Sequence, residues 1–199
     1  RLRVADLGPR LVTVNDRLHV YRPPRWAPRA TGVLGRASQA VYEALLRREL
    51  HRLGFGRPIL WLFLPDMQVF VGRFDESLVI YHVVDEYSGY TGVSDTWRPV
   101  MQRMEEDLAR RADLVFVTSP ALFQSKRVWN ERTSLVPNGV DYAAFKQAVD
   151  APAIPEDVRN LSRPIAGYVG AINDKVDLTL LCHVAQEHAD WTLLLVGPV

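Results

Sequence analysis

The stretch that decides the fold is "SLVIYHVVDEYSGYTG", residues 77–92. Residues 77–84 form an apolar run with several β-branched side chains, which predicts a buried strand. The run ends in Asp85 and Glu86, and a Tyr-Ser-Gly sequence typical of a turn follows. Because desolvating a carboxylate is costly, we expect this acidic pair to lie at a solvated strand end.

Similar apolar runs flank this stretch and alternate with helical patterns. We expect strands at 11–14, 18–21, 58–65, 113–118 and 134–137, helices at 38–54 and 96–111, and a third helix that opens at Ser119-Pro120. A second unit follows, with a strand at 164–171, a helix at 176–189 and a strand at 191–197. This alternation predicts an α/β protein with Rossmann-type parallel sheets.

The domain boundaries follow from a change in composition near residue 148. We expect a Rossmann-like domain over 1–147 that lacks its first strand, a linker over 148–163, and the beginning of a truncated second domain over 164–199. A lone strand–helix–strand unit has no core of its own, which is the reason for expecting truncation.

The composition excludes several classes of protein. Of the 199 residues, 48% are hydrophobic and 24% are charged, which is ordinary for a globular chain. The single cysteine, Cys182, excludes an intramolecular disulfide, and its apolar surroundings predict a buried structural thiol. The longest apolar run, residues 59–64, is too short to span a bilayer, so we expect a cytoplasmic location.

The net charge of +1 conceals an asymmetry. Residues 1–57 contain twelve arginines, no lysine and four acidic residues, and therefore carry +8, while the remainder carries −7. Scattered arginines fit a compositional bias of the genome best. A phosphorylated acceptor, or peripheral contact with an anionic membrane at the inner face of the plasma membrane, also fits.

The ends of the predicted strands are where a ligand is expected. In an open parallel sheet, ligands bind beyond the carboxyl ends of the strands. Asp85 at such an end either faces a cleft or only caps its own turn, and spacing alone leaves both open. The glycine-rich dinucleotide fingerprint, the phosphate-binding loop and the serine-hydrolase elbow are all absent from the sequence. The five histidines lack metal-ligand spacing, so we expect no metal.

Five segments together resemble a known family. They are "YHVVDEYSGY" (81–90), "EEDLARRADLVFVTSPALFQSKR" (105–127), "VPNGVDYAAF" (136–145), "PIAGYVGAINDKVDLTLL" (164–181) and "WTLLLVGPV" (191–199). In this order they resemble bacterial retaining glycosyltransferases of the GT-B fold, of the family 4 or group 1 type. The resemblance is strong from Ile59 to Val199 and weak before Ser38.

The resemblance implies two Rossmann-like domains, the first holding the acceptor and the second the donor. The implied reaction moves a hexose from a nucleotide diphosphate sugar to a glycan or lipid-linked acceptor with retention, in cell-surface polysaccharide assembly. It implies no metal, no other cofactor and no nucleic-acid partner. We expect this 199-residue chain itself to be inactive, because most of the donor site would lie further along.

The resemblance also implies roles for individual residues. The expected catalytic residues are Asp85, Glu86 and His82, and the expected acceptor-binding residues are Asp66, Tyr87, Ser88 and Ser119. Gly170, Asn173 and Lys175 are expected at the donor phosphates, and Asn138, Gly139 and Asp141 at the domain crossover. Gly139 would either supply a backbone angle that glycine reaches cheaply or belong to an ordinary loop turn, and both interpretations are open. Many relatives have an arginine just after the donor-loop glycine, whereas this sequence has Ala171 and Ile172.

Two other functions remain open. A non-catalytic GT-B-like module that binds a glycan or a partner would tolerate the weakly cationic donor loop. A nucleotide-sugar epimerase of the same fold is a further alternative.

Overall fold

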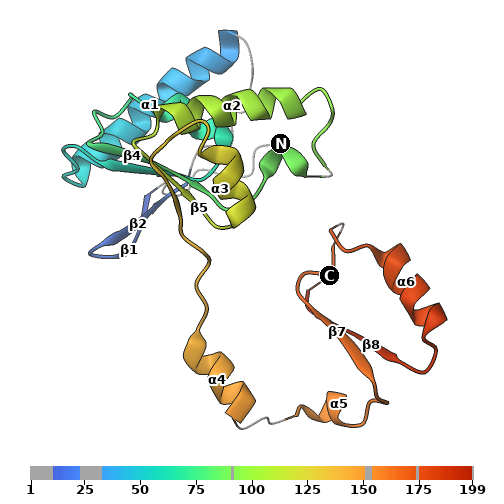
Figure 1. Cartoon of the computed structure of the whole chain (residues 1–199). Helices are drawn as coiled ribbons and strands as arrows, with labels where there is room; N and C mark the ends of the chain where they lie inside the picture. The colour runs from blue at the N-terminus through green and yellow to red at the C-terminus, as the bar shows by residue number, and fades with distance from the viewer. Residues whose placement is uncertain (1–10, 23–32, 91, 151–153, 174, 199) are drawn as a thin grey trace, which may run out of the picture. The chain divides into compact units, whose positions relative to one another are not determined.

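The computed structural model describes residues 11–22, 33–90, 92–150, 154–173 and 175–198. Internal contacts divide the chain into two compact units, Arg1–Pro137 and Asn138–Val199 (Figure 1). The composition change near residue 148 falls at the end of helix α4 (Tyr142–Asp150), inside the second unit. Each unit is described by itself below.

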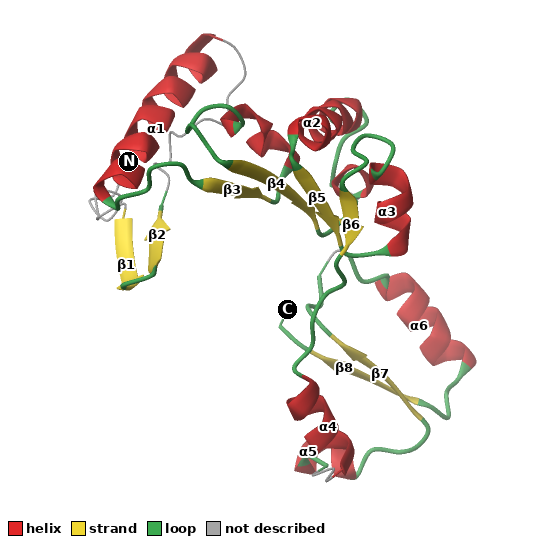
Figure 2. Cartoon of the chain, turned by 60° about the vertical axis from the view of Figure 1, so that its left-hand side comes forward, coloured by secondary structure: helices red, strands yellow, loops and turns green. Residues whose placement is uncertain are grey.

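The first unit is built on a parallel sheet (Figure 2). Its order is β3-β4-β5-β6, so strands adjacent in the sequence are adjacent in space. Strand β4, predicted from the apolar run at 77–84, pairs with β3 on one side and with β5 on the other. Tyr81, for example, lies opposite Leu62 of β3 and Val115 of β5. The strands are β3 (Ile59–Leu62), β4 (Leu78–Val83), β5 (Leu114–Val117) and β6 (Thr133–Leu135).

The connections between these strands are helical. They are the 3-10 helices η2 (Pro65–Phe70) and η3 (Tyr87–Gly89), and the helices α2 (Arg98–Arg111) and α3 (Pro120–Lys126). As predicted, Ser119 caps α3: its hydroxyl accepts a hydrogen bond from the Leu122 amide at 3.3 Å, and Pro120 occupies the first turn. Figure 2 shows α2 and α3 on one side of the sheet.

The core lies between the sheet and these helices. Because side chains alternate across a strand, Tyr81 and Val83 of β4 point to the helices and are fully buried, while His82 points to the opposite face. The main core consists of Leu62, Val71, Val79, Tyr81, Val83, Leu108, Ala109, Ala112, Val115, Val117 and Leu122. On the opposite face the rings of Trp61, His82 and Phe116 lie about 6 Å apart.

An antiparallel hairpin and a long helix complete the described part of this unit. Strands β1 (Leu11–Asn15) and β2 (Leu18–Tyr21) pair as predicted, and α1 spans Val33–Arg52, beginning five residues earlier than the sequence pattern indicates. Tyr42 of α1 lies between the rings of Tyr21 and Phe70, at 6.2 Å and 5.7 Å. This aromatic series connects the hairpin to η2.

The second unit contains a two-stranded parallel sheet. Its elements are α4, α5 (Glu156–Arg159), β7 (Ile165–Val169), α6 (Leu178–Glu187) and β8 (Thr192–Val196). None of the described residues of these five elements is buried. The prediction for Cys182 is therefore wrong: it is exposed, because within the described part of the second unit α6 packs chiefly against β8 of this small sheet.

No helix within the described ranges combines the length and the apolar character needed to cross a bilayer.

Candidate functional site

The carboxyl ends of β4, β5 and β6 meet at one edge of the sheet. The Thr118 hydroxyl donates a hydrogen bond to the Val84 carbonyl at 3.0 Å, and the Val136 amide donates to the Val117 carbonyl at 2.8 Å. These two hydrogen bonds join neighbouring strands just beyond their last residues. The turns that follow β4, β5 and β6 therefore begin side by side. Asp85, Glu86 and Ser119 come directly after these strand ends.

Asp85 is exposed at this edge and accepts a hydrogen bond from the Tyr90 hydroxyl. The hydrogen bond to Asp85 raises the pKa of Tyr90 to about 12, so Tyr90 keeps its proton and remains the donor. The ring of the buried Tyr87 packs edge-on against Tyr90 at 5.8 Å and supports this arrangement. Asp85 is thus an oriented carboxylate that can still accept a hydrogen bond from a ligand hydroxyl.

Glu86 is held differently from its neighbour. Its carboxylate accepts hydrogen bonds from Lys126 Nζ at 2.9 and 3.1 Å and from the Ser88 hydroxyl at 3.0 Å. The side chain is 45% exposed, whereas that of Lys126 is 2% exposed. An ion pair with a buried lysine fixes the carboxylate in place, and Glu86 anchors the turn between β4 and α2 to α3.

A second carboxylate shares the same lysine. Glu105 is fully buried, and its Oε1 accepts from Lys126 Nζ at 3.0 Å and from the Tyr81 hydroxyl at 3.2 Å. Burial raises the pKa of Glu105, while the hydrogen bond and the charge of Lys126 act in the opposite direction. The other oxygen, Oε2, is buried and has no hydrogen-bond partner among the described residues. The Lys126 ammonium also lies 4.9 Å from the centre of the Trp129 ring.

The sequence analysis assigned no role to Glu105, Lys126 or Tyr81. The sequence did contain a sign that Glu105 is buried. Glu105 precedes the apolar Leu108 by three residues, so both fall on the inner face of α2. An acidic residue on an inner face needs a partner. The sequence did not identify that partner, because Lys126 is 21 residues away and meets Glu105 only through the packing of α2 and α3.

A cavity of about 490 Å³ opens beside this cluster. Its walls offer carboxylates, an ammonium and a guanidinium, hydroxyls and an indole ring. Such a wall suits a ligand with several hydroxyl groups, because each hydroxyl can both donate and accept hydrogen bonds. The residues that supply these groups are Glu86, Ser88, Arg103, Ser125, Lys126 and Trp129.

The remaining residues predicted in the first unit lie in different places. Asp66 is exposed in the first turn of η2, after the end of β3. Ser119 is engaged as the cap of α3. Tyr87 and Ser88 are buried in η3, where the Ser88 carbonyl accepts a hydrogen bond from Arg98. Of the four predicted acceptor-binding residues, only Ser88 lines the cavity beside Glu86.

His82, the next-to-last residue of β4, points to the face of the sheet opposite the main core. Its Nδ1 is 3.3 Å from the Trp61 indole nitrogen, which donates, and the ring of Phe63 lies 5.2 Å away. Burial lowers the pKa of His82, since removing an imidazolium from water is unfavourable. Its Nε2 is buried without a hydrogen-bond partner among the described residues. The surroundings are those of a neutral histidine within an aromatic cluster.

The predicted donor loop follows β7 in the second unit. The Gly170 amide donates to the Val196 carbonyl at 3.0 Å, and the Asn173 side-chain oxygen accepts from the Lys175 amide at 3.0 Å. Asp177 caps α6, with its carboxylate accepting from the Leu180 amide at 2.9 Å. A carboxylate at this position repels a phosphate group and occupies one of the free amides of the helix. The sequence analysis did not consider this effect of Asp177.

Gly197 is a residue that the sequence analysis missed. A Cβ atom at this position would collide with the backbone carbonyl of Gly170, so only glycine allows the ends of β7 and β8 to approach so closely. At Gly170 an added Cβ would meet the Tyr168 ring at 2.9 to 3.5 Å.

The crossover residues lie where the two units join, since Asn138 is the first residue of the second unit. Asp141 accepts a hydrogen bond from the Ala144 amide at 3.1 Å at the start of α4. The first interpretation of Gly139, a backbone angle that glycine reaches cheaply, is wrong: its φ is not positive, and an added Cβ would meet no atom within 4 Å.

Within the described part of the chain, no three His, Cys, Asp or Glu side chains lie close enough together to hold a metal ion.

Comparison with known proteins finds similarity both in sequence and in structure. No family model matches the chain. The protein of Bacillus subtilis (strain 168) named "Putative teichuronic acid biosynthesis glycosyltransferase TuaH" is 29% identical over 154 residues, which cover 71% of this chain and 38% of that protein. Sucrose-phosphate synthase from Thermosynechococcus elongatus superposes with a TM-score of 0.57 at 14% identity, over 96% of this chain and 58% of that chain.

The structural match and the sequence match support different conclusions. At 14% identity the structural match shows the fold alone, and it confirms the predicted α/β, GT-B-like architecture. The sequence match shows similarity to a glycosyltransferase. The chain spans 38% of the length of the first protein and 58% of the second.

Proposed function

We propose that this chain is part of a glycosyltransferase that moves a hexose from a nucleotide diphosphate sugar to a glycan or lipid-linked acceptor, with retention of configuration, in cell-surface polysaccharide assembly. The observation that carries the proposal is the 29% identity to a glycosyltransferase over 154 residues. The oriented carboxylate of Asp85, at the edge of the sheet where α/β proteins bind ligands, supports it.

In this proposal the first unit holds the acceptor. Asp85 accepts a hydrogen bond from the acceptor hydroxyl and serves as its base, while Tyr90 keeps the carboxylate oriented. Glu86 and Ser88 contact the rest of the acceptor from the cavity beside Lys126. Glu86 acts as an anchor for this turn more readily than as a base, since its carboxylate is already paired.

The second unit contributes to the donor site. Lys175 and the backbone amides around Gly170 stabilise the departing diphosphate, which is the main source of rate acceleration in this type of transfer. The proposal assigns no metal to the reaction and places the enzyme in the cytoplasm, at the inner face of the plasma membrane. Asp177 caps α6 beside this loop, and its negative charge opposes the binding of a phosphate there.

The test uses the complete product of the gene that encodes this chain. The protein is incubated with a panel of nucleotide diphosphate sugars and with glycan or lipid-linked acceptors. Release of nucleoside diphosphate is measured, and the anomeric configuration of the product is read by NMR. Acceptor-dependent release with retention is expected. A product of inverted configuration would contradict the mechanism, and donor consumption to a free epimerised sugar would favour the epimerase.

The role of Asp85 is tested in the same assay with Asp85→Asn. A general base contributes about 10² to 10⁴ in rate, so turnover is expected to fall at least about 100-fold. The matched control is Asp16→Asn, which makes the same change at an exposed position in the turn of the hairpin and is expected to leave turnover within about twofold. If both variants lowered turnover by the same small amount, Asp85 would only cap its own turn and would not act as the base. Glycan binding without any turnover would favour the non-catalytic module.

A further inference from the structure

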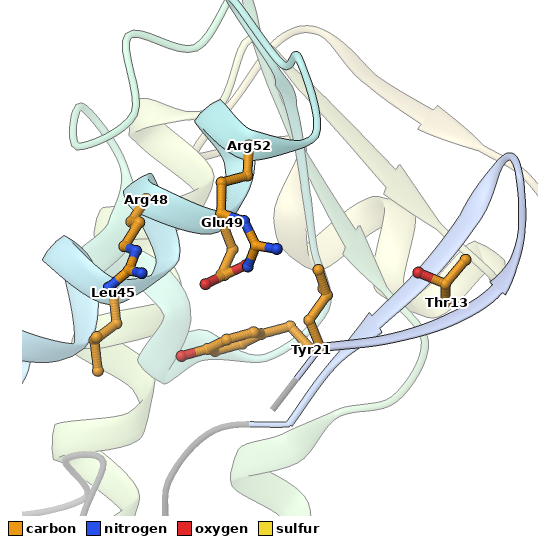
Figure 3. A pocket seen from close by; sticks show the side chains of 7 residues that line it. Thr13, Tyr21, Leu45, Arg48, Glu49 and Arg52 are labelled. Carbon is orange, nitrogen blue, oxygen red and sulfur yellow. The ribbon is translucent and has the colours of Figure 1, made fainter. Parts of the chain in front are cut away.

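A second cavity of about 490 Å³ lies between the β1-β2 hairpin and α1 (Figure 3). It shares no lining residue with the cavity beside Glu86 and Lys126. The helix contributes Arg48, Glu49 and Arg52 to its wall, and β2 contributes Tyr21. Figure 3 shows these helix side chains extending from α1 on the side where the Tyr21 ring lies. Nothing in the proposed glycosyl transfer uses this cavity.

The charge in the cavity is positive. Arg48 and Arg52 are four residues apart and therefore project from the same face of α1. Arg52 is paired with Glu49 at 2.7 Å and remains 61% exposed, while Arg48 is exposed and has no ion pair or hydrogen bond within the described part of the chain. Two guanidinium groups face a single carboxylate, which leaves one positive charge unbalanced.

The opposite wall supplies a hydrogen-bond donor and apolar surface. The Tyr21 hydroxyl is buried from solvent and has no hydrogen-bond partner among the described residues. A buried hydroxyl without a partner is unfavourable, so a ligand atom that accepts its proton would relieve a cost that the unliganded protein carries. Leu11 and Leu45 line the same cavity and present hydrocarbon beside these polar groups.

We propose that this cavity binds a phosphate group carried by a molecule whose adjoining part is apolar. The planar guanidinium groups of Arg48 and Arg52 match the oxygen atoms of a phosphate, and the Tyr21 hydroxyl provides a further donor. The residues around the cavity favour the same ligand. The hairpin that lines the cavity exposes the apolar side chains of Val14, Leu18 and Val20, which fit an apolar group next to the phosphate. A lipid headgroup and a soluble phosphate ester are both sources of this chemistry.

The first test titrates the 199-residue chain with inorganic phosphate and follows backbone amide signals by NMR. Saturable shifts are expected at α1 and β2. Arg48→Gln and Arg52→Gln are each expected to weaken binding by about tenfold, since each removes a charge-assisted hydrogen bond. Arg47→Gln is the matched control: it makes the same charge change on the same helix, but Arg47 lies over the Phe74 ring at 5.7 Å and does not line the cavity.

Tyr21→Phe separates binding from stability. Among the described residues the hydroxyl has no hydrogen-bond partner to lose, so the variant is expected to unfold at the same or a higher urea concentration than the unchanged protein. Phosphate binding is nonetheless expected to weaken several-fold. Unchanged phosphate affinity in Tyr21→Phe, or an Arg47→Gln variant that loses as much affinity as Arg48→Gln, would overturn the proposed site.

The second test identifies the source of the phosphate. Sedimentation compares vesicles of pure phosphatidylcholine with vesicles of equal parts phosphatidylcholine and phosphatidylglycerol. Binding to the anionic vesicles alone, lost in the Arg48→Gln and Arg52→Gln double variant, assigns the cavity to a lipid headgroup. Saturable binding of inorganic phosphate without vesicle binding assigns it to a soluble phosphate compound. Absence of both kinds of binding would overturn the proposal, and this result is independent of whether sugar transfer is observed.

Discussion

The two parallel sheets of this protein, β3-β4-β5-β6 and β7-β8, both contain apolar strands, but only the first sheet buries them. Val115 and Val117 of β5 have no exposed surface, whereas Val169 of β7 is 83% exposed. The central strands β4 and β5 have a neighbour on each side and helices on one face, while β7 and β8 pair only with each other. Burial therefore depends on how many elements surround a strand, and the apolar pattern alone does not determine it.

The same contrast applies to charged groups. In the first unit Lys126 and Glu105 form an ion pair with almost no exposed surface, at 3.0 Å. In the second unit Lys146 and Asp150 are 3.7 Å apart and more than half exposed. Removing one partner should lower the stability strongly only at the buried pair, because only there is the remaining charge shielded from water.

The largest expected effect tests this difference in charge. Lys126→Met leaves Glu105 buried without a counter-ion and should reduce the free energy of unfolding by about 3 to 5 kcal/mol. Lys146→Met, the matched change at the exposed pair, should cost less than about 1 kcal/mol. Urea unfolding followed by tryptophan fluorescence measures both.

Adding Glu105→Gln to Lys126→Met sharpens this test. The double variant removes the unpaired buried charge, so it should recover part of the lost stability. Equal losses for Lys126→Met and Lys146→Met would contradict the contrast between the two units.

The second comparison concerns apolar side chains. Val83→Ala in β4 removes two fully buried carbon atoms and should cost about 2 kcal/mol of unfolding free energy. Val169→Ala, the same change at an exposed position of β7, should stay within about 0.5 kcal/mol of the unchanged protein. A costly Val169→Ala substitution would show that β7 is covered in solution.

The third prediction concerns the pH dependence of the first unit. Burial lowers the pKa of His82, so the unfolded chain binds a proton more readily than the folded one. The stability from neutral His82 is complete above about pH 6.5, the unfolded value, and is lost as the pH falls from there through the folded pKa. Denaturant melts at a series of pH values should show this loss.

His82→Gln is the control for that measurement, since glutamine does not titrate and can still accept the hydrogen bond from Trp61. In this variant the loss of stability below about pH 6.5 should become smaller. An unchanged pH profile would assign the titration to another group.

The smallest expected effect concerns the exposed helix of the second unit. Cys182 on α6 should react with a thiol reagent in the native protein to the full extent seen in urea. Because the side chain is exposed, the labelled protein should unfold within about 0.5 kcal/mol of the unlabelled one. Protection of Cys182 that disappears only on unfolding would mean that α6 is covered in solution.

The sequence was informative about local structure. The alternation of apolar runs and amphipathic helices predicted the strands in their order along the chain, the cap at Ser119 and the α/β class, because these depend on short-range periodicity and capping chemistry. The GT-B-like class came from the resemblance to a known family. It also placed Asp85 and Glu86 at a strand end, because an acidic pair that follows an apolar run rarely continues into a core.

What the sequence by itself determined is therefore the strands, the longer helices between them and the residues at their ends, while the short helices η2, η3, α4 and α5 were not predicted. Only the tertiary structure decided which side chains are buried and paired: Cys182 is exposed, Lys126 joins Glu86 to Glu105, and Arg48 and Arg52 face Tyr21. The physical reason is that the apolar pattern and the caps act within a few neighbouring residues, whereas burial and ion pairing depend on segments brought together from distant parts of the chain.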